Sequence, residues 1–284
     1  MHFDEFNEQV VKSLEECFSD CKVELKPVVK NNGIKLTGVY VFQEDSEVAP
    51  CIYLESYWDM YRQGEPFCDI MEKITDTLKE AIDDVPFDRP IFDREFIKKS
   101  VFLKLLNRER NTEYASEVLK KELGDLIVVF SLLIENSGDR ILSMLLTEKM
   151  CEPFNLTVDD LYETALNNTR EFFPLHSQSL VELFRTKFSD EIPESFYDDT
   201  PEALIISNTS FIDGATVVLY PEFKEVLGED FSGWIIPSSI HEVLAIEIGD
   251  YKDLSELIIS VNENILREEE ILSNHPYRLE DFNI

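Results

Sequence analysis

The sequence predicts an α+β protein with a mostly antiparallel sheet, built from hairpins that alternate with helices. One observation is that two pairs of strand-like segments each flank a short turn; the pairs are 22–30 with 34–42 and 126–134 with 140–146. The first turn contains Asn32-Gly33, and this dipeptide supplies the positive φ angles of a tight hairpin. The second observation is that apolar residues recur at three- and four-residue spacing between these hairpins, which indicates amphipathic helices.

The first 90 residues predict a helix, the first hairpin, a strand and two further helices. The expected ranges are 3–20 for the first helix, 50–54 for the strand, a helix that ends at Gly64, and about 67–82 for the last helix. The segment 83–90, DDVPFDRP, then interrupts the helical pattern. We therefore expect one α+β fold over residues 1–284, or its subdivision into an amino-terminal part, 1–85, and a carboxy-terminal part, 86–284.

The remaining chain predicts strands and helices in alternation. In order, we expect a strand at 101–106, a helical or irregular insert at 113–122, the second hairpin, a helix that begins near Thr157, a strand at 203–207, a helical stretch at 215–228 broken by Pro221, strands at 234–237 and 242–248, and a helix at 253–266. The strands at 234–237 and 242–248 are joined by a short polar link, so they are expected to be antiparallel neighbours.

The charge of the chain is strongly negative. Lys and Arg number 26 against 58 Asp and Glu, which gives a formal net charge of −32. Such a surface repels nucleic-acid phosphate and anionic membranes, and it attracts basic proteins. The charge therefore predicts no direct nucleic-acid binding and no membrane binding. Two interpretations of it stay open: the acids keep the protein soluble in a crowded cytosol, or they bind a protein partner with a basic surface.

Three further observations predict a cytoplasmic protein. The amino-terminal segment lacks the basic and apolar regions of a signal peptide. The longest apolar run, 126–134, is about half of the length that crosses a bilayer. The five Cys residues are odd in number and irregularly spaced, as is typical of a reducing compartment.

The motifs of several enzyme classes are missing from the sequence. It contains no GxxxxGK[ST] phosphate-binding loop, no GxGxxG dinucleotide motif, no GxSxG nucleophile elbow and no HExxH zinc motif. Cys17 and Cys21 lie four positions apart and could meet in space, but no second Cys or His pair lies near them in the sequence. We therefore predict no cofactor and no metal.

One compact polar constellation, Ser238-Ser239-Ile240-His241-Glu242, remains as a candidate for catalysis. In a hydrolase, His241 would be the general base and Ser238 or Ser239 the nucleophile. Residues two or three apart in a turn seldom align an imidazole with a hydroxyl, and the sequence does not identify the acid that would orient His241. The alternative is structural, with Ser and His side chains closing hydrogen bonds of a turn.

A second candidate is the aromatic group Tyr57, Trp58 and Tyr61 on the helix that ends at Gly64. Aromatic residues at this spacing belong to a core in most proteins. The alternative is a binding surface for a peptide or a small molecule.

Several segments resemble a clostridial family of unknown function that is found in gut Firmicutes. The resemblance rests on APCIYLESYWDMYRQGE at 49–65, and above all on PSSIHEV at 237–243 and LSNHPYR at 272–278. A weaker likeness, through LIVVFSLLIENSGDRILSML at 126–145, links the chain to an uncharacterised cytosolic family of bacilli. The resemblance implies a bacterial cytoplasmic protein, and it provides no catalytic residue. The insert at 113–121 departs from the family pattern.

The sequence thus favours a non-catalytic module that binds another protein, with nucleic-acid mimicry as one form of that function. The charge and the missing catalytic motifs support this hypothesis. The alternative hypothesis is an unrecognised hydrolase centred on His241 with Ser238 or Ser239.

Overall fold

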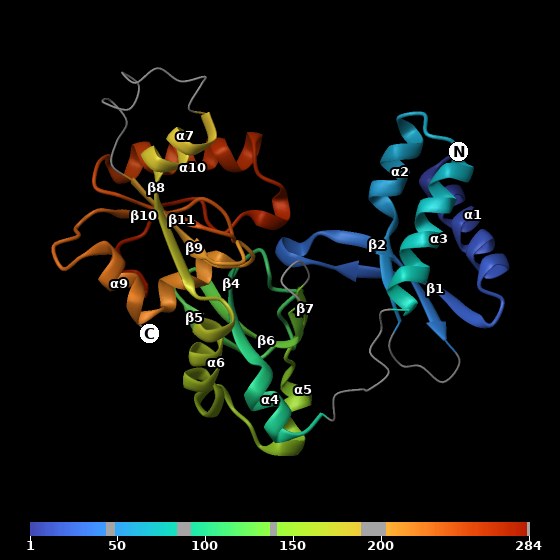
Figure 1. Ribbon diagram of the computed structural model, residues 1–284, viewed down its shortest axis with the longest axis horizontal. Coiled ribbons are helices and arrows are strands. Elements are labelled where there is room, and N and C mark those ends of the chain that lie inside the picture. Colours follow the sequence, from blue (N-terminus) through green and yellow to red (C-terminus); the bar gives the residue numbers. More distant parts are fainter. Residues whose placement is uncertain (44–48, 84–91, 137–140, 189–202, 283–284) are drawn as a thin grey trace. The chain divides into compact units, whose positions relative to one another are not determined.

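The computed structural model describes residues 1–43, 49–83, 92–136, 141–188 and 203–282 (Figure 1). It divides into a smaller unit, residues 1–30 and 34–90, and a larger unit, residues 31–33 and 91–284. The subdivision expected at residue 85 falls within 84–91, outside the described residues. The described strands form three sheets in which every pairing is antiparallel, which confirms the predicted fold class.

The smaller unit packs three helices on a three-stranded sheet. Its elements are α1 (Phe3–Cys17), β1 (Cys21–Val29), β2 (Lys35–Gln43), β3 (Cys51–Tyr53), α2 (Leu54–Arg62) and α3 (Phe67–Asp83). The predicted hairpin is confirmed, since β1 pairs with β2 from Cys21 opposite Gln43 to Val29 opposite Lys35. Asn32 and Gly33 adopt φ angles of 58° and 73°, as the Asn-Gly pair predicts.

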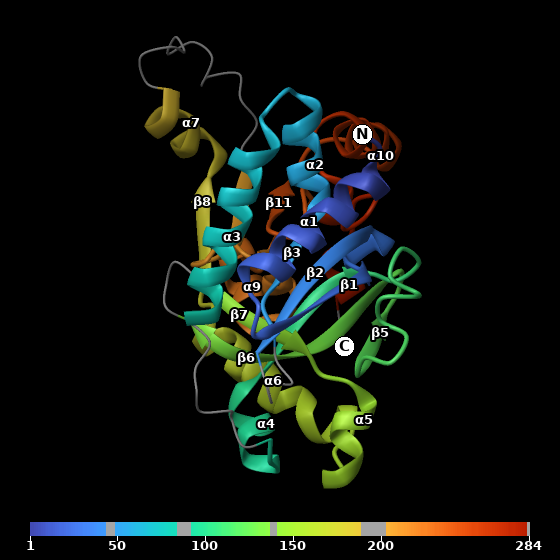
Figure 2. The same ribbon diagram turned by 90° about the vertical axis from the view of Figure 1, so that its right-hand side faces the viewer.

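The core of the smaller unit lies between the helices and one face of this sheet (Figure 2). Val39 and Val41 of β2 point to that face because side chains two residues apart share a side of a strand. They meet the apolar stripes of α1 and α3, whose fully buried members are Phe6, Val10, Leu14, Ile70, Ile74 and Leu78. The three- and four-residue spacing of these residues is the reason that the two helices form amphipathic faces here.

The first half of the larger unit builds a sheet with the order β4-β6-β5, and β7 also pairs with β6. Its elements are α4 (Arg94–Ser100), β4 (Val101–Asn107), β5 (Lys120–Leu123), β6 (Leu126–Asn136), β7 (Ile141–Leu145), α5 (Glu148–Cys151), η2 (Glu152–Phe154) and α6 (Val158–Phe172). Thr157 caps α6 as predicted, since its hydroxyl accepts from the backbone N–H of Asp160 and the Asp160 carboxylate accepts in return. The turn predicted at 136–139 extends into residues 137–140, outside the described residues.

The second half builds a sheet with the order β10-β11-β9-β8. Its elements are β8 (Leu175–Ser179), α7 (Leu180–Phe188), β9 (Ala203–Asn208), η3 (Gly214–Leu219), α9 (Pro221–Leu227), β10 (Trp234–Pro237), β11 (Val243–Ile246), α10 (Tyr251–Asn264), η4 (Glu268–Glu270) and η5 (Leu279–Phe282). The predicted antiparallel pair is confirmed, with Trp234 opposite Ile246. Pro221 begins α9, so the helical stretch divides there as expected.

Both sheets of the larger unit contribute to one hydrophobic core. Phe130 of β6, Ile206 of β9 and Val243 of β11 are buried in it, together with Leu161 and Ala165 of α6. Helices α7 and α10 contact strands of the second sheet (Figure 1). In this unit Asn32 and Asn111 also exchange two hydrogen bonds of 2.9 Å, which satisfy buried amide groups.

The structure corrects one predicted element and adds two. The segment 113–122 is expected to be helical or irregular, but β5 begins at Lys120 and pairs with β6. Lys120, Lys121 and Glu122 carry no apolar alternation, so only the pairing with β6 makes this segment a strand. Residues 175–188 show no clear periodicity, and they form β8 and α7. None of the helices in the described ranges combines the length and the apolar character that crossing a bilayer requires.

Candidate functional site

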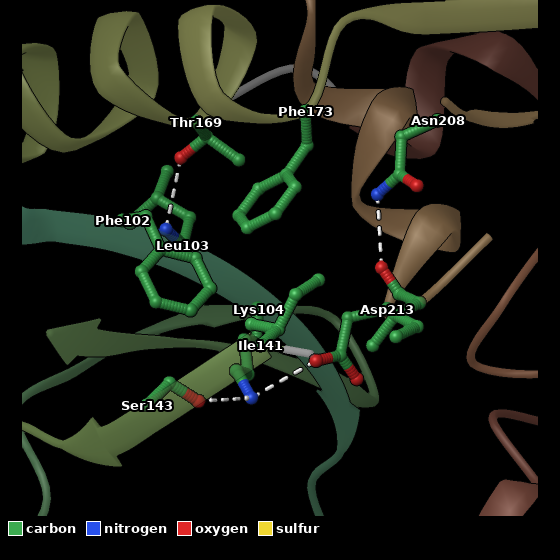
Figure 3. Close-up of a pocket in the computed structure, with 10 residues that line it drawn as sticks. Phe102, Leu103, Lys104, Ile141, Ser143, Thr169, Phe173, Asn208 and Asp213 are labelled. Atoms are coloured by element: carbon green, nitrogen blue, oxygen red, sulfur yellow. Dashed lines mark hydrogen bonds and ion pairs between the residues drawn. The ribbon is translucent and has the colours of Figure 1, made fainter. Parts of the chain in front are cut away.

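A small cavity in the larger unit brings together an ammonium group and a carboxylate (Figure 3). Its volume is about 100 Å³, and it lies between β4, β7, the end of α6 and the loop that follows β9. The wall contains both apolar and polar side chains, among them Phe102, Lys104, Ile141, Ser143, Phe173 and Asp213. A space of this size holds a few water-sized groups and is too small for a large ligand.

Lys104 and Asp213 form an ion pair at this cavity. The Lys104 Nζ atom lies 2.9 Å from Asp213 Oδ2 and donates to Ser143 Oγ at 3.3 Å. The two charged side chains are only 20% and 18% exposed. Burial lowers the pKa of Lys104, but the Asp213 carboxylate outweighs burial and raises that pKa above its usual value. Lys104 therefore keeps its proton at neutral pH and cannot act as a nucleophile or a base.

The loop that carries Asp213 has a constrained backbone. Phe211 and Asp213 adopt φ angles of 56° and 51°, in the left-handed region that favours glycine. The Asn208 side chain stabilises this path, because its Nδ2 atom donates to the carbonyl of Ile212 at 2.9 Å and its Oδ1 atom accepts from the N–H of Ser210 at 3.0 Å. The ion pair with Lys104 adds a tie between this loop and β4. The left-handed residues cost free energy, and the Asn208 hydrogen bonds and the ion pair with Lys104 hold the loop in this strained conformation.

His241 lies on the other side of this loop. Its Nδ1 atom accepts from the backbone N–H of Asp213 at 3.2 Å, and its Nε2 atom lies 3.8 Å from Glu270 Oε1. The accepted hydrogen bond requires an unprotonated Nδ1. His241 therefore acts on the backbone of the constrained loop, as an acceptor.

The serines near His241 bond to other groups. Ser238 Oγ donates to Glu242 Oε1 at 2.9 Å, and Ser239 Oγ accepts from the backbone N–H of His241 at 3.0 Å. Within the described ranges neither hydroxyl is hydrogen bonded to the imidazole ring. The structure brings the four predicted residues into one turn, and their hydrogen bonds match the structural interpretation of that turn better than a hydrolase arrangement.

The aromatic group of the smaller unit lies at the edge of its core. Trp58 stacks on Tyr61 with ring centres 5.6 Å apart, and Phe6 lies 5.4 Å from Trp58. Tyr57, Trp58 and Tyr61 are all partly buried and pack against the core residues. The rings of Trp58 and Tyr61 thus contact Phe6 of α1 in the same unit, as is typical of aromatic residues that close a core.

A surface with a mixed apolar and acidic character lies on α10. The helix buries Leu254 and Ile258 against the sheet, whereas Leu257 is 56% exposed and Ile265, at the end of the helix, is 75% exposed. Leu257, Val261 and Ile265 follow one another at four-residue spacing, which places them side by side along one flank. We call these three residues the α10 flank.

Acidic side chains surround the α10 flank. From Glu247 to Glu270 the sequence has eight acidic and two basic residues. Both bases already have acidic partners: Lys252 lies 3.6 Å from Glu256, and Arg267 pairs with Glu270. Asp253 and Glu263 are exposed on the outer side of the helix. The excess of negative charge next to exposed apolar side chains suits a basic amphipathic partner.

The residues that form these sites come from distant parts of the chain. Lys104 is on β4 and Asp213 precedes η3, and the sequence around each gives no sign of the other. The spacing of apolar residues on this helix predicts that Leu254, Leu257, Ile258, Val261 and Ile265 are all buried. This prediction is wrong for Leu257 and Ile265, because the helix turns only Leu254 and Ile258 fully to the sheet. The described residues contain no group of three or more His, Cys, Asp or Glu side chains that could hold a metal ion.

The fold and these sites define an acidic α+β protein with a polar, charge-paired interior and a mixed surface helix. The chain belongs to a family of unknown function, DUF5688, whose model matches residues 3–280. This match confirms that nearly the whole chain is a domain of unknown function, which is the coarser part of the resemblance. Neither the curated proteins nor the solved structures include a match to the chain.

Proposed function

We propose that this protein is a non-catalytic binding module for another protein, and that the α10 flank contacts a basic amphipathic helix of that partner. The exposure of Leu257 and Ile265 among uncompensated acids is the observation that supports the proposal. A partner helix would cover the apolar flank with its own apolar stripe and would place a Lys or Arg side chain against Asp253, which lies one helical turn before Leu257. The partner is met in the cytoplasm of a Firmicutes bacterium, as the family resemblance implies.

The mixed character of this surface favours helix binding over nucleic-acid mimicry. A mimic of nucleic acid presents a row of negative charges at phosphate-like spacing. On and at the end of α10 the acids are interrupted by Leu257, Val261 and Ile265. Burial of these apolar side chains against a partner would add to the binding free energy, and a surface that mimics phosphates lacks this contribution. The hydrolase alternative has less support, because the hydroxyls of Ser238 and Ser239 are hydrogen bonded away from the His241 ring.

A defined peptide tests the proposal. The probe is a synthetic Leu/Lys peptide of 14 residues, the length of α10, with apolar residues at helical spacing. The reference is a peptide of the same composition in which that spacing is lost. Isothermal titration should show the periodic peptide binding about tenfold more tightly, since only this peptide can lay a leucine stripe on the flank.

Two variants assign the binding to the α10 flank. Leu257→Ser should weaken binding of the periodic peptide about tenfold, whereas Leu142→Ser, at another exposed leucine on β7, should leave it unchanged. Binding should also weaken as salt rises from about 50 to about 300 mM, because charges contribute. Equal affinity for the two peptides, or an equal response of the two variants, would show that only bulk charge attracts the probe and would overturn the proposal.

A further inference from the structure

A second and larger cavity in the larger unit lies at the start of α10. Its volume is about 400 Å³, within the range of small-molecule sites. Residues of four segments line it: the turn between β5 and β6, the start of β10, the start of α10 and the carboxy-terminal segment. The side chains that matter for recognition are Asp125, Trp234, Tyr251, His275, Tyr277 and Arg278.

The backbone positions these side chains firmly. Tyr277 forms an isolated antiparallel bridge with Ile235, with N–O distances of 2.9 and 2.8 Å in the two directions. This bridge lays residues 275–278 along β10. Gly124, with a φ of 60°, turns the chain between β5 and β6 and presents Asp125 to the same place.

Asp125 holds two aromatic residues of the carboxy-terminal segment. The Tyr277 hydroxyl donates to its carboxylate at 3.0 Å, and His275 Nε2 lies 3.1 Å from Oδ2. His275 Nδ1 lies 3.0 Å from the carbonyl oxygen of Pro276. Both ring nitrogens thus face acceptors, and an imidazole satisfies two acceptors only when both nitrogens carry protons. This arrangement favours the imidazolium form, and the hydrogen bond to Asp125 raises the pKa of His275 although burial acts against it.

The imidazolium is part of an aromatic wall. Its ring centre lies 4.6 Å from that of Tyr277 and 6.1 Å from that of Tyr251, and Tyr251 lies 5.8 Å from Trp234. Tyr251 is 51% exposed, so its ring is accessible to a ligand. A cationic ring and exposed aromatic faces both favour contact with the flat face of another aromatic ring.

Arg278 provides a directed pair of donors beside this wall. Its guanidinium carbon lies 3.4 Å from the centre of the Trp234 ring, and Nη1 donates to the carbonyls of Ser232 and Gly233, at 2.7 Å for the latter. Within the part of the chain that the structure describes, its Nε and Nη2 atoms have no partner. These two atoms share one edge of the guanidinium, and such an edge matches a carboxylate through two parallel hydrogen bonds.

From this arrangement we propose that the cavity binds a planar aromatic carboxylate. The ring stacks on Tyr251 and the charged His275 ring, and the carboxylate pairs with the Nε–Nη2 edge of Arg278. Asp125 does not oppose the ligand, because its charge is already matched by His275. Asp281 also lines the cavity and weakens anion binding, so the stacking contact supplies a large share of the affinity. The site is independent of the α10 flank.

Three related probes separate the two parts of the recognition. They are 2-naphthoate, its neutral amide 2-naphthamide, and decalin-2-carboxylate, which keeps the charge and loses the aromatic ring. Ligand-observed NMR and calorimetry on the full chain should show 2-naphthoate binding at least about fivefold more tightly than either of the others. Equal binding of naphthoate and the decalin acid, or no binding of any probe, would overturn the proposal.

Variants then assign each part to its residue. Arg278→Lys keeps the charge and removes the two-donor edge, so it should abolish the preference for naphthoate over naphthamide. Tyr251→Leu should abolish the preference for naphthoate over the decalin acid. Arg170→Lys, at a partly exposed arginine of α6 that pairs with Glu222 and does not line the cavity, is the matched control and should change neither preference. Unchanged preferences in both site variants, with thermal unfolding like that of the control, would contradict the assignment.

Discussion

His241 and His275 belong to the same unit, and their surroundings differ in the number of acceptors that face the ring. His241 accepts from a backbone N–H, so one of its nitrogens lacks a proton. His275 faces a carboxylate on one side and a carbonyl on the other, so both of its nitrogens carry protons. The first ring is a hydrogen-bond acceptor in a turn, and the second ring faces two acceptors in a lined cavity.

This difference shows which kind of contact creates a candidate binding group in this fold. The turn with His241 is dense in polar residues along the sequence, and both serine hydroxyls form hydrogen bonds within the turn. The partners of His275 include Asp125, which lies 150 positions away in the chain. The contact between Asp125 and His275, which are far apart in the sequence, places a titratable side chain at a cavity. The polar residues around His241 instead stabilise the backbone of a turn.

The largest expected effect comes from the tight packing beneath the His241 turn. A Cβ atom on Gly214 would lie 2.1 Å from Ser207 Oγ and 2.2 Å from the carbonyl oxygen of His241, and these two atoms are joined by a hydrogen bond of 2.7 Å. Gly214→Ala should therefore lower the free energy of unfolding by about 3 kcal/mol or more, because backbone has to move. Urea denaturation followed by circular dichroism measures this change.

Gly124→Ala, beside Asp125, provides the comparison in the second region. A Cβ atom there meets no other atom within 4 Å, so the cost is only the left-handed backbone, about 1–2 kcal/mol. Equal losses in the two variants would contradict the view that the His241 turn is the more tightly packed of the two regions.

The sequence could predict the elements of this fold better than its sites. The hairpin at Asn32-Gly33, the cap at Thr157 and the break at Pro221 depend on local chemistry, and all three are confirmed. The strand β5 depends on pairing with β6, and the local sequence does not contain that information. The same reason hides the Lys104–Asp213 and Asp125–His275 pairs, since each joins residues that only the folded chain brings together.

A smaller effect, and one that depends on pH, is expected at His275. The hydrogen bond to Asp125 raises the pKa of His275 in the folded chain, although burial acts against it. Because the pKa is higher in the folded chain, protonated His275 stabilises the fold. This stabilisation is complete below the pKa of the unfolded chain, about 6.5, and it is lost as pH rises through the folded pKa. His275→Gln removes the titrating group, so the free energy of unfolding should fall less between about pH 6 and pH 9 than in the unchanged chain.

The expected difference in this fall is about 1 kcal/mol or less, because the pair is partly exposed and solvent screens it. On the acidic side, burial raises the pKa of Asp125 but the hydrogen bonds from His275 and Tyr277 outweigh it and lower that pKa. Its stabilisation is present above about pH 4 and is lost as pH falls through the folded pKa. Parallel profiles for the unchanged chain and His275→Gln would show that His275 gains no charge-dependent stability.

The smallest expected effect comes from two variants of His241. They separate the packing of its ring from its role as a hydrogen-bond acceptor. In His241→Asn, the amide oxygen can replace Nδ1 as the acceptor for the Asp213 N–H, and stability should change by less than about 0.5 kcal/mol. His241→Ala removes the acceptor and should cost about 1 kcal/mol more than the Asn variant, measured by urea denaturation. Equal costs in the two variants would argue that the ring acts through its packing instead. If an amide can replace this imidazole, its proton chemistry is unused, and His275 is then the histidine of this pair whose charge matters.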